Sequence, residues 1–448
     1  MSRRTSEYPI TRPRSDSPVS RTPELLILLL AALLGAGAIA LGSGGGNDAA
    51  GTVHAATASP THVRLIERRV EALRGLRFRR AVPVVVVSPA QARREGLAEF
   101  DRGQPREQRR VSEELLKLLG LLPPSADLRA IAGSVYGEQV AGYYDPRRKR
   151  LALVRGAGVD DVTLAHELTH ALEDQYADLA KLGAGGGDDA STAQQALVEG
   201  SATLVMGRYA ARWPSQAPLG DALAGLTQVT SATPLPQYMA RTLVFPYFQG
   251  ESFVQALLGA DGGGWQLVDV AERQRPPRTT AEILHPTRWL RAAQPERVRI
   301  VGAPDLSRAA GWRQLSASTL GEEDVAALLS PAAGPLAARK AMSHWRGGRY
   351  ALWRRGPLVE ESCTAPCRTR DALELAVRMD DVTAARALGA MLSTWLTRTL
   401  HARRLASDAH GGLWRLPGGS VGALRTVGGT VRAGMAPRAG LARRLVGD

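Results

Sequence analysis

Residues 160–176 read DDVTLAHELTHALEDQY, and this stretch decides the fold of the chain. Neither proline nor glycine interrupts it, and Asp160 or Asp161 can cap the free amides at the start of a helix. His166 and His170 are four residues apart. On a helix, side chains at that spacing lie on one face with β-carbons about 5–6 Å apart. The stretch therefore predicts a helix that presents two imidazoles side by side.

Two imidazoles so placed can bind one zinc ion, and the pattern H-E-x-x-H adds a carboxylate beside the first of them. Glu167 can take a proton from water that a metal ion has made acidic. The alternative is a pair of histidines on the helix surface. The flanking residues favour the metal, because imidazoles buried in an apolar helix without a partner are costly. Those flanking residues are Val162, Ala165, Leu168, Thr169 and Leu172.

A second helix offers the third protein ligand that a catalytic zinc requires. After a glycine-rich loop, Ser191 or Thr192 can cap a helix that reads AQQALVEGSATLVMGRYAARW. Glu199 is its one acidic residue and has apolar neighbours, so the carboxylate needs either a metal ion or one of the chain's many arginines as a partner. Gly200 and Ser201 are small enough for the two helices to approach closely. We expect Glu199 to be a ligand.

The runs HELTHALEDQ and LVEGSATLVM together resemble the gluzincin group of zinc metallopeptidases, in particular minimal bacterial members with a downstream Glu-Gly-x-Ala. The specific similarity covers roughly residues 135–210. It implies that His166, His170 and Glu199 hold one zinc ion per chain and that Glu167 is the general base in peptide-bond hydrolysis. It also implies that the preceding hairpin is an edge strand, to which an extended peptide or protein substrate adds.

The chain departs from the gluzincin pattern in one respect. Many gluzincins have an acidic residue four positions after the glutamate ligand, where it orients a histidine. Thr203 stands at that place here. Asp174, four residues after His170, is the alternative residue for this role.

Peptide hydrolysis also needs a donor that stabilises the negative oxygen of the transition state. The candidates are His285 in Ile-Leu-His-Pro and Tyr247 in Phe-Pro-Tyr-Phe. A helix-capping histidine and a core tyrosine are the alternatives to those roles. Tyr143 and Tyr144 can line a substrate cleft, although tyrosines in a hairpin usually serve ordinary packing.

Residues 25–42 form an 18-residue stretch without charge. As a helix it would be roughly 27 Å long, close to the thickness of a membrane's hydrocarbon core. Arginines precede it, so we expect a cytoplasmic tail (1–22), a single transmembrane anchor (23–42) in the cell membrane and an extracytoplasmic remainder. A cleaved signal peptide is the rival, but its leader and apolar core are usually shorter.

The expected fold class is α+β. Residues 43–60 form a flexible linker, residues 61–298 a zincin-like metallopeptidase domain with a small sheet, and residues 299–448 a C-terminal α+β domain of unknown role. The sequence predicts a helix over 62–75, a buried strand at Val84–Val87, a helix over Val111–Leu122, and a hairpin over 135–154 that turns at Asp145-Pro146.

Composition excludes some function classes. The formal net charge is +14, but only four basic residues are lysines and the arginines are spread along the whole chain. We therefore expect no nucleic-acid partner. Nothing in the sequence indicates an oligomeric state.

Cys363 and Cys367 are the only cysteines, too few for a structural zinc site. A short local disulfide is expected in an oxidising compartment, and two unpaired thiols are the alternative.

Two other function classes compete with the peptidase. One is a non-enzymatic extracytoplasmic scaffold that retains a zinc site, and the other is a soluble regulatory zinc protein. The intact Glu167 argues against the first, because its loss is the simplest route to an inactive enzyme. The predicted anchor argues against the second.

Overall fold

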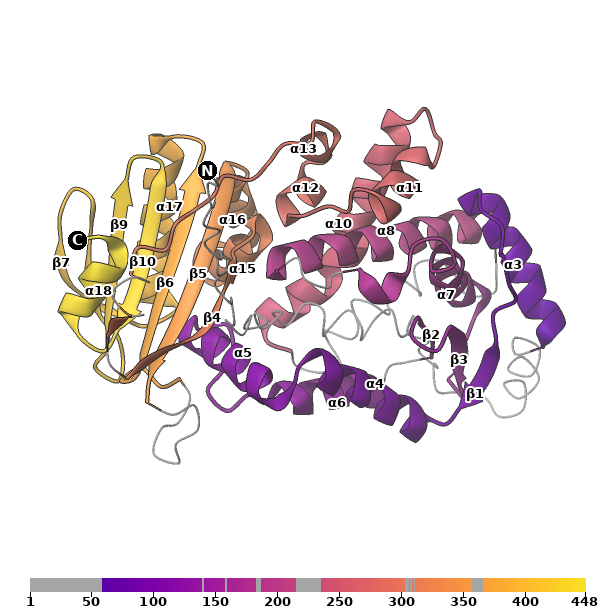
Figure 1. The fold of residues 1–448 in the computed structure, drawn as a ribbon, viewed down its shortest axis with the longest axis horizontal. Helices are drawn as coiled ribbons and strands as arrows, with labels where there is room; N and C mark the ends of the chain where they lie inside the picture. The colour runs from indigo at the N-terminus through magenta and orange to yellow at the C-terminus, as the bar shows by residue number, and fades with distance from the viewer. Residues whose placement is uncertain are drawn as a thin grey trace, which may run out of the picture.

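In a computed structural model of the full chain, the structure describes residues 59–138, 141–157, 159–182, 187–214, 235–302, 306, 308–309, 311–356 and 366–448. The molecule is elongated, with a small sheet and several helices at one end and a large sheet at the other (Figure 1). Within the described ranges no helix is both long and apolar enough to cross a membrane. The predicted tail and anchor lie outside those ranges.

The first helix, α3 (Pro60–Arg74), confirms the helix predicted over 62–75. Ser59 caps its start by accepting a hydrogen bond from the amide of His62, and Pro60 takes the first turn, where no amide donor is needed. Gly75 ends the helix with a φ of 76°, in the left-handed region that favours glycine.

The small sheet has the strand order β1-β3-β2. β1 (Val84–Val87) runs parallel to the central strand β3 (Arg150–Val154), and β2 (Gly142–Asp145) pairs with β3 in the antiparallel sense. The strand predicted at Val84–Val87 is therefore present, but its predicted burial is wrong. β1 is an edge strand, and Val86 is 49% exposed.

Two predicted boundaries also need correction. The hairpin holds only over β2 and β3, since residues up to Glu138 belong to α6 (Leu128–Glu138). The helix predicted over Val111–Leu122 is α5 (Arg106–Leu118), and it ends before Pro123 because Gly120 adopts a φ of 71°. α4 (Pro89–Gly103) packs against α6, and its Glu95 accepts hydrogen bonds from Tyr143 of β2 and Arg150 of β3.

Two long helices follow the small sheet. α7 (Asp161–Glu173) contains the histidine pair, and α8 (Asp188–Arg212) crosses it. α10 (Gln237–Ala260) packs along α8 and contains Pro246. Three shorter helices complete this half: α11 (Gln266–Arg273), α12 (Thr280–Leu284) and α13 (Pro286–Leu290).

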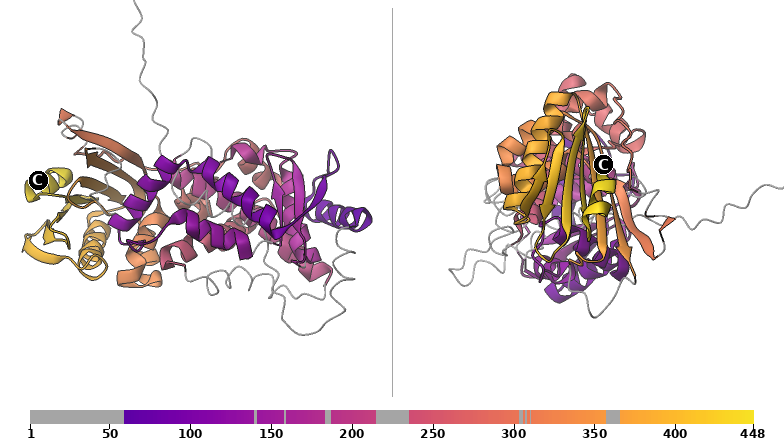
Figure 2. Two further views of the ribbon diagram at one scale, coloured as in Figure 1. Left: turned by 90° about the horizontal axis from the view of Figure 1, so that it is seen from below. Right: turned by 90° about the vertical axis from the view of Figure 1, so that its left-hand side faces the viewer.

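The C-terminal half is built on a seven-stranded antiparallel sheet in the order β4-β5-β6-β10-β9-β8-β7. α15, α16 and α17 lie on one side of it and α18 on the other (Figure 2). The strands are β4 (Trp312–Thr319), β5 (Trp345–Arg355), β6 (Asp371–Met379), β7 (Arg403–Ser407), β8 (Gly411–Arg415), β9 (Val421–Val427) and β10 (Thr430–Ala436). The helices are α15 (Glu322–Ala333), α16 (Pro335–Met342), α17 (Val382–Arg398) and α18 (Ala439–Val446).

The chain is thus a mixed α+β protein, as expected. One hydrophobic cluster combines side chains of both halves, including Leu115 of α5 and Trp395 of α17, and the Trp395 indole donates a hydrogen bond to the Leu119 carbonyl oxygen. The domain boundary at residue 299 stays a prediction. Cys367 is disulfide-bonded, whereas Cys363, its predicted partner, lies outside the described residues.

Candidate metal centre

α7 positions the H-E-x-x-H residues in the protein interior. Asp160 caps it by accepting a 2.6 Å hydrogen bond from the amide of Thr163, which resolves the choice between the two predicted capping residues. His166 and His170 are 3% and 4% exposed, and Glu167 is 0% exposed. The histidines therefore do not lie on the surface, and the alternative reading of the pair is wrong.

α8 brings Glu199 to the pair. The helix begins earlier than predicted, at Asp188 rather than after Ser191 or Thr192, because two aspartates occupy its first turn, where the positive end of the helix favours them. Glu199 is 3% exposed. Its Oε2 lies 3.3 Å from His166 Nε2 and 3.5 Å from His170 Nε2, and the two Nε2 atoms are 3.1 Å apart. The three side chains could hold a metal ion.

The size of this triangle fits zinc. A tetrahedral zinc ion with bonds of about 2.0–2.1 Å separates its ligand atoms by roughly 3.3 Å. The three measured distances, 3.1, 3.3 and 3.5 Å, bracket that value. The donor set of two imidazoles and one carboxylate is also one that catalytic zinc sites use.

Electrostatics at the site favour a cation. Burial tends to raise the pKa of Glu199, but the two histidines outweigh burial and lower that pKa to about 2. Burial lowers the pKa of His166. Burial acts in the same direction on His170, but the carboxylate of Glu199 outweighs it and raises that pKa to about 9. An ionised, buried carboxylate thus faces two ring nitrogens at one point.

Glu167 stands next to these three residues and is held by β2. Its Oε2 accepts a 2.7 Å hydrogen bond from the amide of Tyr144, while its buried Oε1 has no hydrogen-bond partner among the described residues. Burial raises the pKa of this carboxyl to about 8. Since β2 is an edge strand of the small sheet, Glu167 lies beside the strand edge that the resemblance implies for substrate.

The site also includes Tyr247 of α10, one of the two candidate oxyanion donors. Its ring stacks on His166, with centroids 6.1 Å apart and an interplanar angle of 24°. Its buried hydroxyl makes no hydrogen bond within the described part of the chain. Burial, followed by the negative charges of Glu199 and Glu167, raises its pKa well above the ordinary value, so the hydroxyl keeps its proton.

A pair of glycines brings α10 this close to α8. Gly200 follows Glu199 directly, and it meets Gly250, three residues after Tyr247. A β-carbon on either glycine would overlap backbone atoms of the opposite helix. We expected Gly200 to admit α7, but the side on which its β-carbon would lie meets α10, whereas Ser201 donates a hydrogen bond to Glu173 of α7.

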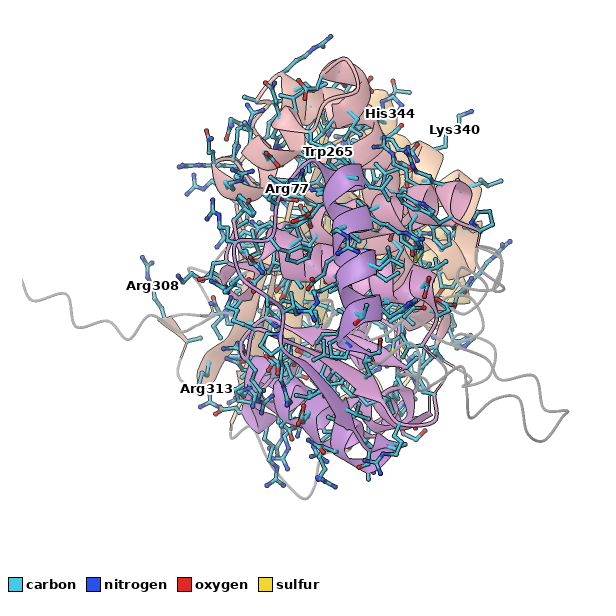
Figure 3. All side chains as sticks on the ribbon, turned by 90° about the vertical axis from the view of Figure 1, so that its right-hand side faces the viewer. Arg77, Trp265, Arg308, Arg313, Lys340 and His344 are labelled. Carbon is cyan, nitrogen blue, oxygen red and sulfur yellow. The ribbon has the colours of Figure 1, made fainter. Side chains whose placement is uncertain are left out.

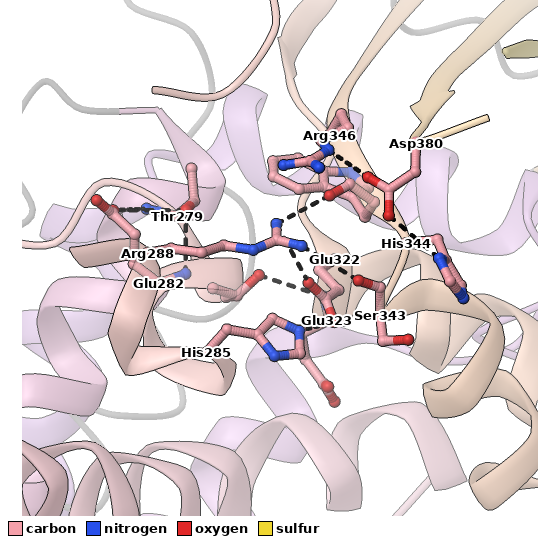
Figure 4. Close-up of polar contacts among 12 residues, drawn as sticks. Thr279, Glu282, His285, Arg288, Glu322, Glu323, Ser343, His344, Arg346 and Asp380 are labelled. Carbon is pink, nitrogen blue, oxygen red and sulfur yellow. Dashed lines mark hydrogen bonds and ion pairs between the residues drawn. The ribbon is translucent and has the colours of Figure 1, made fainter. Parts of the chain in front are cut away.

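The other candidate donor, His285, is engaged elsewhere. Its Nε2 lies 2.9 Å from Glu322 Oε1 at the start of α15, where the two halves of the molecule meet (Figure 4). Arg288 beside it donates to the carbonyl oxygens of Ser343 and Trp345. Of the two predicted donors, the structure brings only Tyr247 to the histidine pair.

Successive residues of β2 point to opposite faces of the sheet, so Tyr143 and Tyr144 pack in two different hydrophobic clusters. Both also form hydrogen bonds. Tyr143 donates to Glu95, and Tyr144 donates a 2.6 Å hydrogen bond to Asp174. Asp174 also pairs with Lys149 at 2.8 Å. Its predicted role in orienting a histidine is therefore not supported by its contacts.

No described residue replaces Asp174 in that role. The Nδ1 atoms of His166 and His170 are buried and have no hydrogen-bond partner in the described ranges, and neither does the hydroxyl of Thr203. Among the described residues, the helix that carries the imidazoles and the Tyr247 ring stacked on His166 orient them.

Sequence reasoning missed one buried group beside the site, formed by Arg74, Glu173, Ser201 and Glu272. A signal was present in α3. Its buried residues are Val63, Ile66, Val70 and Arg74, so the arginine occupies the next position of an apolar stripe. An arginine at a core position needs buried acidic partners.

Comparison of the chain with protein-family models, with curated proteins and with solved structures gave no match.

Proposed function

We propose that the protein is a zinc metallopeptidase that hydrolyses peptide bonds on the extracytoplasmic side of the membrane. The observation that carries the proposal is the buried triangle of His166 Nε2, His170 Nε2 and Glu199 Oε2, whose edges of 3.1–3.5 Å match tetrahedral zinc. When bound, zinc would act as a Lewis acid, which lowers the pKa of water to about 7 and polarises a carbonyl group.

Glu167 is the proposed general base. One of its oxygens is fixed by the amide of Tyr144, which leaves the other, Oε1, free to accept a proton from water and to deliver it to the departing amine. Tyr247 is the proposed oxyanion donor, because its protonated hydroxyl is buried beside the histidines and next to the Glu199 carboxylate.

The edge strand β2 is the proposed substrate platform. Within the described residues β2 pairs only with β3, and we place an extended peptide at its other edge, where the Tyr144 amide donates to Glu167. Tyr144 lies on this strand and contacts Glu167, so a peptide added there would pass close to the proposed base.

The second candidate is a scaffold that binds zinc without catalysis. The observation that favours it is burial: His166, Glu167, His170 and Glu199 are each at most 4% exposed. A peptide reaches such a site only if the structure opens, whereas a purely structural zinc needs no access.

The variant Glu167→Gln separates the two candidates. Gln at this position keeps an oxygen for the Tyr144 amide but cannot act as a base, so the protein should retain fold and zinc while cleavage falls by about 10²–10⁴-fold. Casein and a peptide library read by mass spectrometry are suitable substrates, with a chelator and zinc re-addition as controls. If neither wild type nor variant cleaves any substrate while zinc is bound, the result favours the scaffold. Equal cleavage by both contradicts the assigned role of Glu167.

A further inference from the structure

A buried ion network joins four helices behind the histidine pair. Arg74 at the end of α3 has no exposed side-chain surface, and the same is true of Glu173 in α7 and Glu272 in α11. Arg74 Nε lies 2.6 Å from Glu173 Oε1, and its Nη2 lies 3.0 Å from Glu272 Oε2. Nη2 also lies 2.9 Å from Asp269. Three carboxylates therefore hold the guanidinium group at Nε and Nη2, while its buried Nη1 has no hydrogen-bond partner among the described residues.

An aromatic ring covers the Arg74 guanidinium group. The Arg74 guanidinium lies 4.4 Å from the ring centroid of Trp265. Trp265 is beside the C-terminal end of α3, as the view of the right-hand side of the molecule shows (Figure 3), and its indole donates to the Leu73 carbonyl oxygen. A cation enclosed by carboxylates and an aromatic face has little freedom to move.

Ser201 connects the network to the second ligand helix. Its hydroxyl donates to Glu173 Oε1, the same oxygen that Arg74 contacts. Glu173 follows His170 by three residues and Ser201 follows Glu199 by two. The hydrogen bond therefore joins α7 to α8 close to the ligands that each helix carries.

This connection matters because the described residues offer the two histidine ligands few other directional contacts. Neither histidine has an Nδ1 partner among the described residues. Metal sites require their ligands within about 0.5 Å of the productive geometry. Apolar contact between helices is not directional, whereas a hydrogen bond to a charged group is. The relative placement of α7 and α8 therefore determines whether Glu199 reaches the two Nε2 atoms.

We infer that Arg74, Glu173 and Ser201 are positioning residues, which hold Glu199 against the histidine pair and thereby set the affinity for zinc. The inference rests on zinc binding at the proposed site but not on peptidase activity. It also links α3 to the metal centre, because loss of the Arg74 guanidinium group would leave Glu173 and Glu272 buried without their cation.

The test measures the Kd for zinc of the full-length protein by competition with a chromophoric chelator. Ser201→Ala removes one hydroxyl and leaves Glu173 paired with Arg74, and it should weaken zinc binding roughly 10-fold. Glu173→Ala removes both contacts and should weaken binding by about 10–100-fold. Glu173→Gln keeps an oxygen that can accept from Ser201, so its Kd should lie between those of wild type and Glu173→Ala.

The matched control is Asp371→Ala, which removes a buried carboxyl group that accepts two hydrogen bonds from Arg354 at 2.6 Å in the large sheet. It should lower thermal stability and leave the zinc Kd unchanged.

If folded Ser201→Ala and Glu173→Ala both bind zinc within about threefold of wild type, well short of a positioning effect, the network only stabilises the fold and the inference is overturned. Should Glu173→Ala not fold, Ser201→Ala decides alone. Wild-type protein that binds no zinc overturns the proposed function as well, whereas cleavage activity without these affinity losses overturns only the inference.

Discussion

Gly200 of α8 packs backbone to backbone against Gly250 of α10, so closely that neither position has room for a β-carbon. Glu199 precedes the first glycine, and Tyr247 lies one helical turn before the second. The contact therefore brings the proposed third ligand and the proposed oxyanion donor to one point. Two sequence runs that are distant in the chain, VEGSA and YFQGES, meet here.

Gly200→Ala should consequently be destabilising. The methyl group would overlap the carbonyl carbon of Gly250, and relief requires the two helices to separate. We expect a loss of about 1–3 kcal/mol or more in the free energy of unfolding, measured by denaturant titration, together with weaker zinc binding.

Gly207 in the same helix provides the control, since a β-carbon there meets nothing within 4 Å. Gly207→Ala should stabilise the protein by about 0.5–1 kcal/mol, because alanine in a helix loses less backbone entropy than glycine. Similar effects of the two substitutions would mean that α8 and α10 do not meet as described.

Tyr247→Phe tests the proposed oxyanion donor. Because the hydroxyl is buried and has no hydrogen-bond partner among the described residues, its removal should leave stability unchanged or slightly higher. Zinc content should also be unchanged. If the hydroxyl donates only in the transition state, kcat should fall by about 10²–10³-fold with little change in KM. If kcat of the variant equals that of wild type, Tyr247 is not the oxyanion donor and serves only packing.

Asp189 predicts a pH dependence of stability. It is 1% exposed and accepts hydrogen bonds from the amide and hydroxyl of Thr280 at 2.8 and 2.6 Å. Burial, and then the negative charge of Asp324, raises its pKa from 3.8 to about 8. At a pH between these two pKa values, the Asp189 carboxyl group is protonated in the folded state and ionised in the unfolded state. Stability should therefore fall as pH rises, by up to about 1.4 kcal/mol per pH unit.

Asp189→Asn carries no titratable group but keeps the oxygen that faces Thr280. The fall in unfolding free energy between about pH 5 and pH 8 should be shallower in this variant, as measured by urea titration at each pH. Identical slopes for wild type and variant would show that Asp189 is already ionised in the folded protein.

Topology gives a further prediction. If arginines before the apolar segment keep residues 1–22 in the cytoplasm, alkaline phosphatase fused after Asp448 should be active, because this reporter works only outside the cytoplasm. A fluorescent protein that folds only in the cytosol serves as the opposite reporter. Fluorescence without phosphatase activity would reverse the orientation.

The site was predictable where the signal is local. His166 and His170 are separated by one helical turn, so α7 alone fixes their relation, and the apolar neighbours of Glu199 mark a carboxylate that must find a partner. The α3 helix was likewise predictable, because its serine cap, its proline and its final glycine are all within the segment.

The rest depended on contacts between distant segments. Nothing near Tyr247 or His285 in the sequence says which one meets the histidines, since that follows from the Gly200–Gly250 contact. The start of α8 was misplaced for a related reason. Asp189 lies in its first turn and is held by Thr280, which is remote in the chain.

The claim that a zinc ion binds His166, His170 and Glu199 is tested most directly by metal analysis of the full-length protein by mass spectrometry. Wild type should contain about one zinc per chain. His166→Ala and Glu199→Ala should each lose most of it, whereas Glu167→Gln should retain it. Full zinc occupancy in a His166→Ala/His170→Ala double variant would contradict the account at its centre.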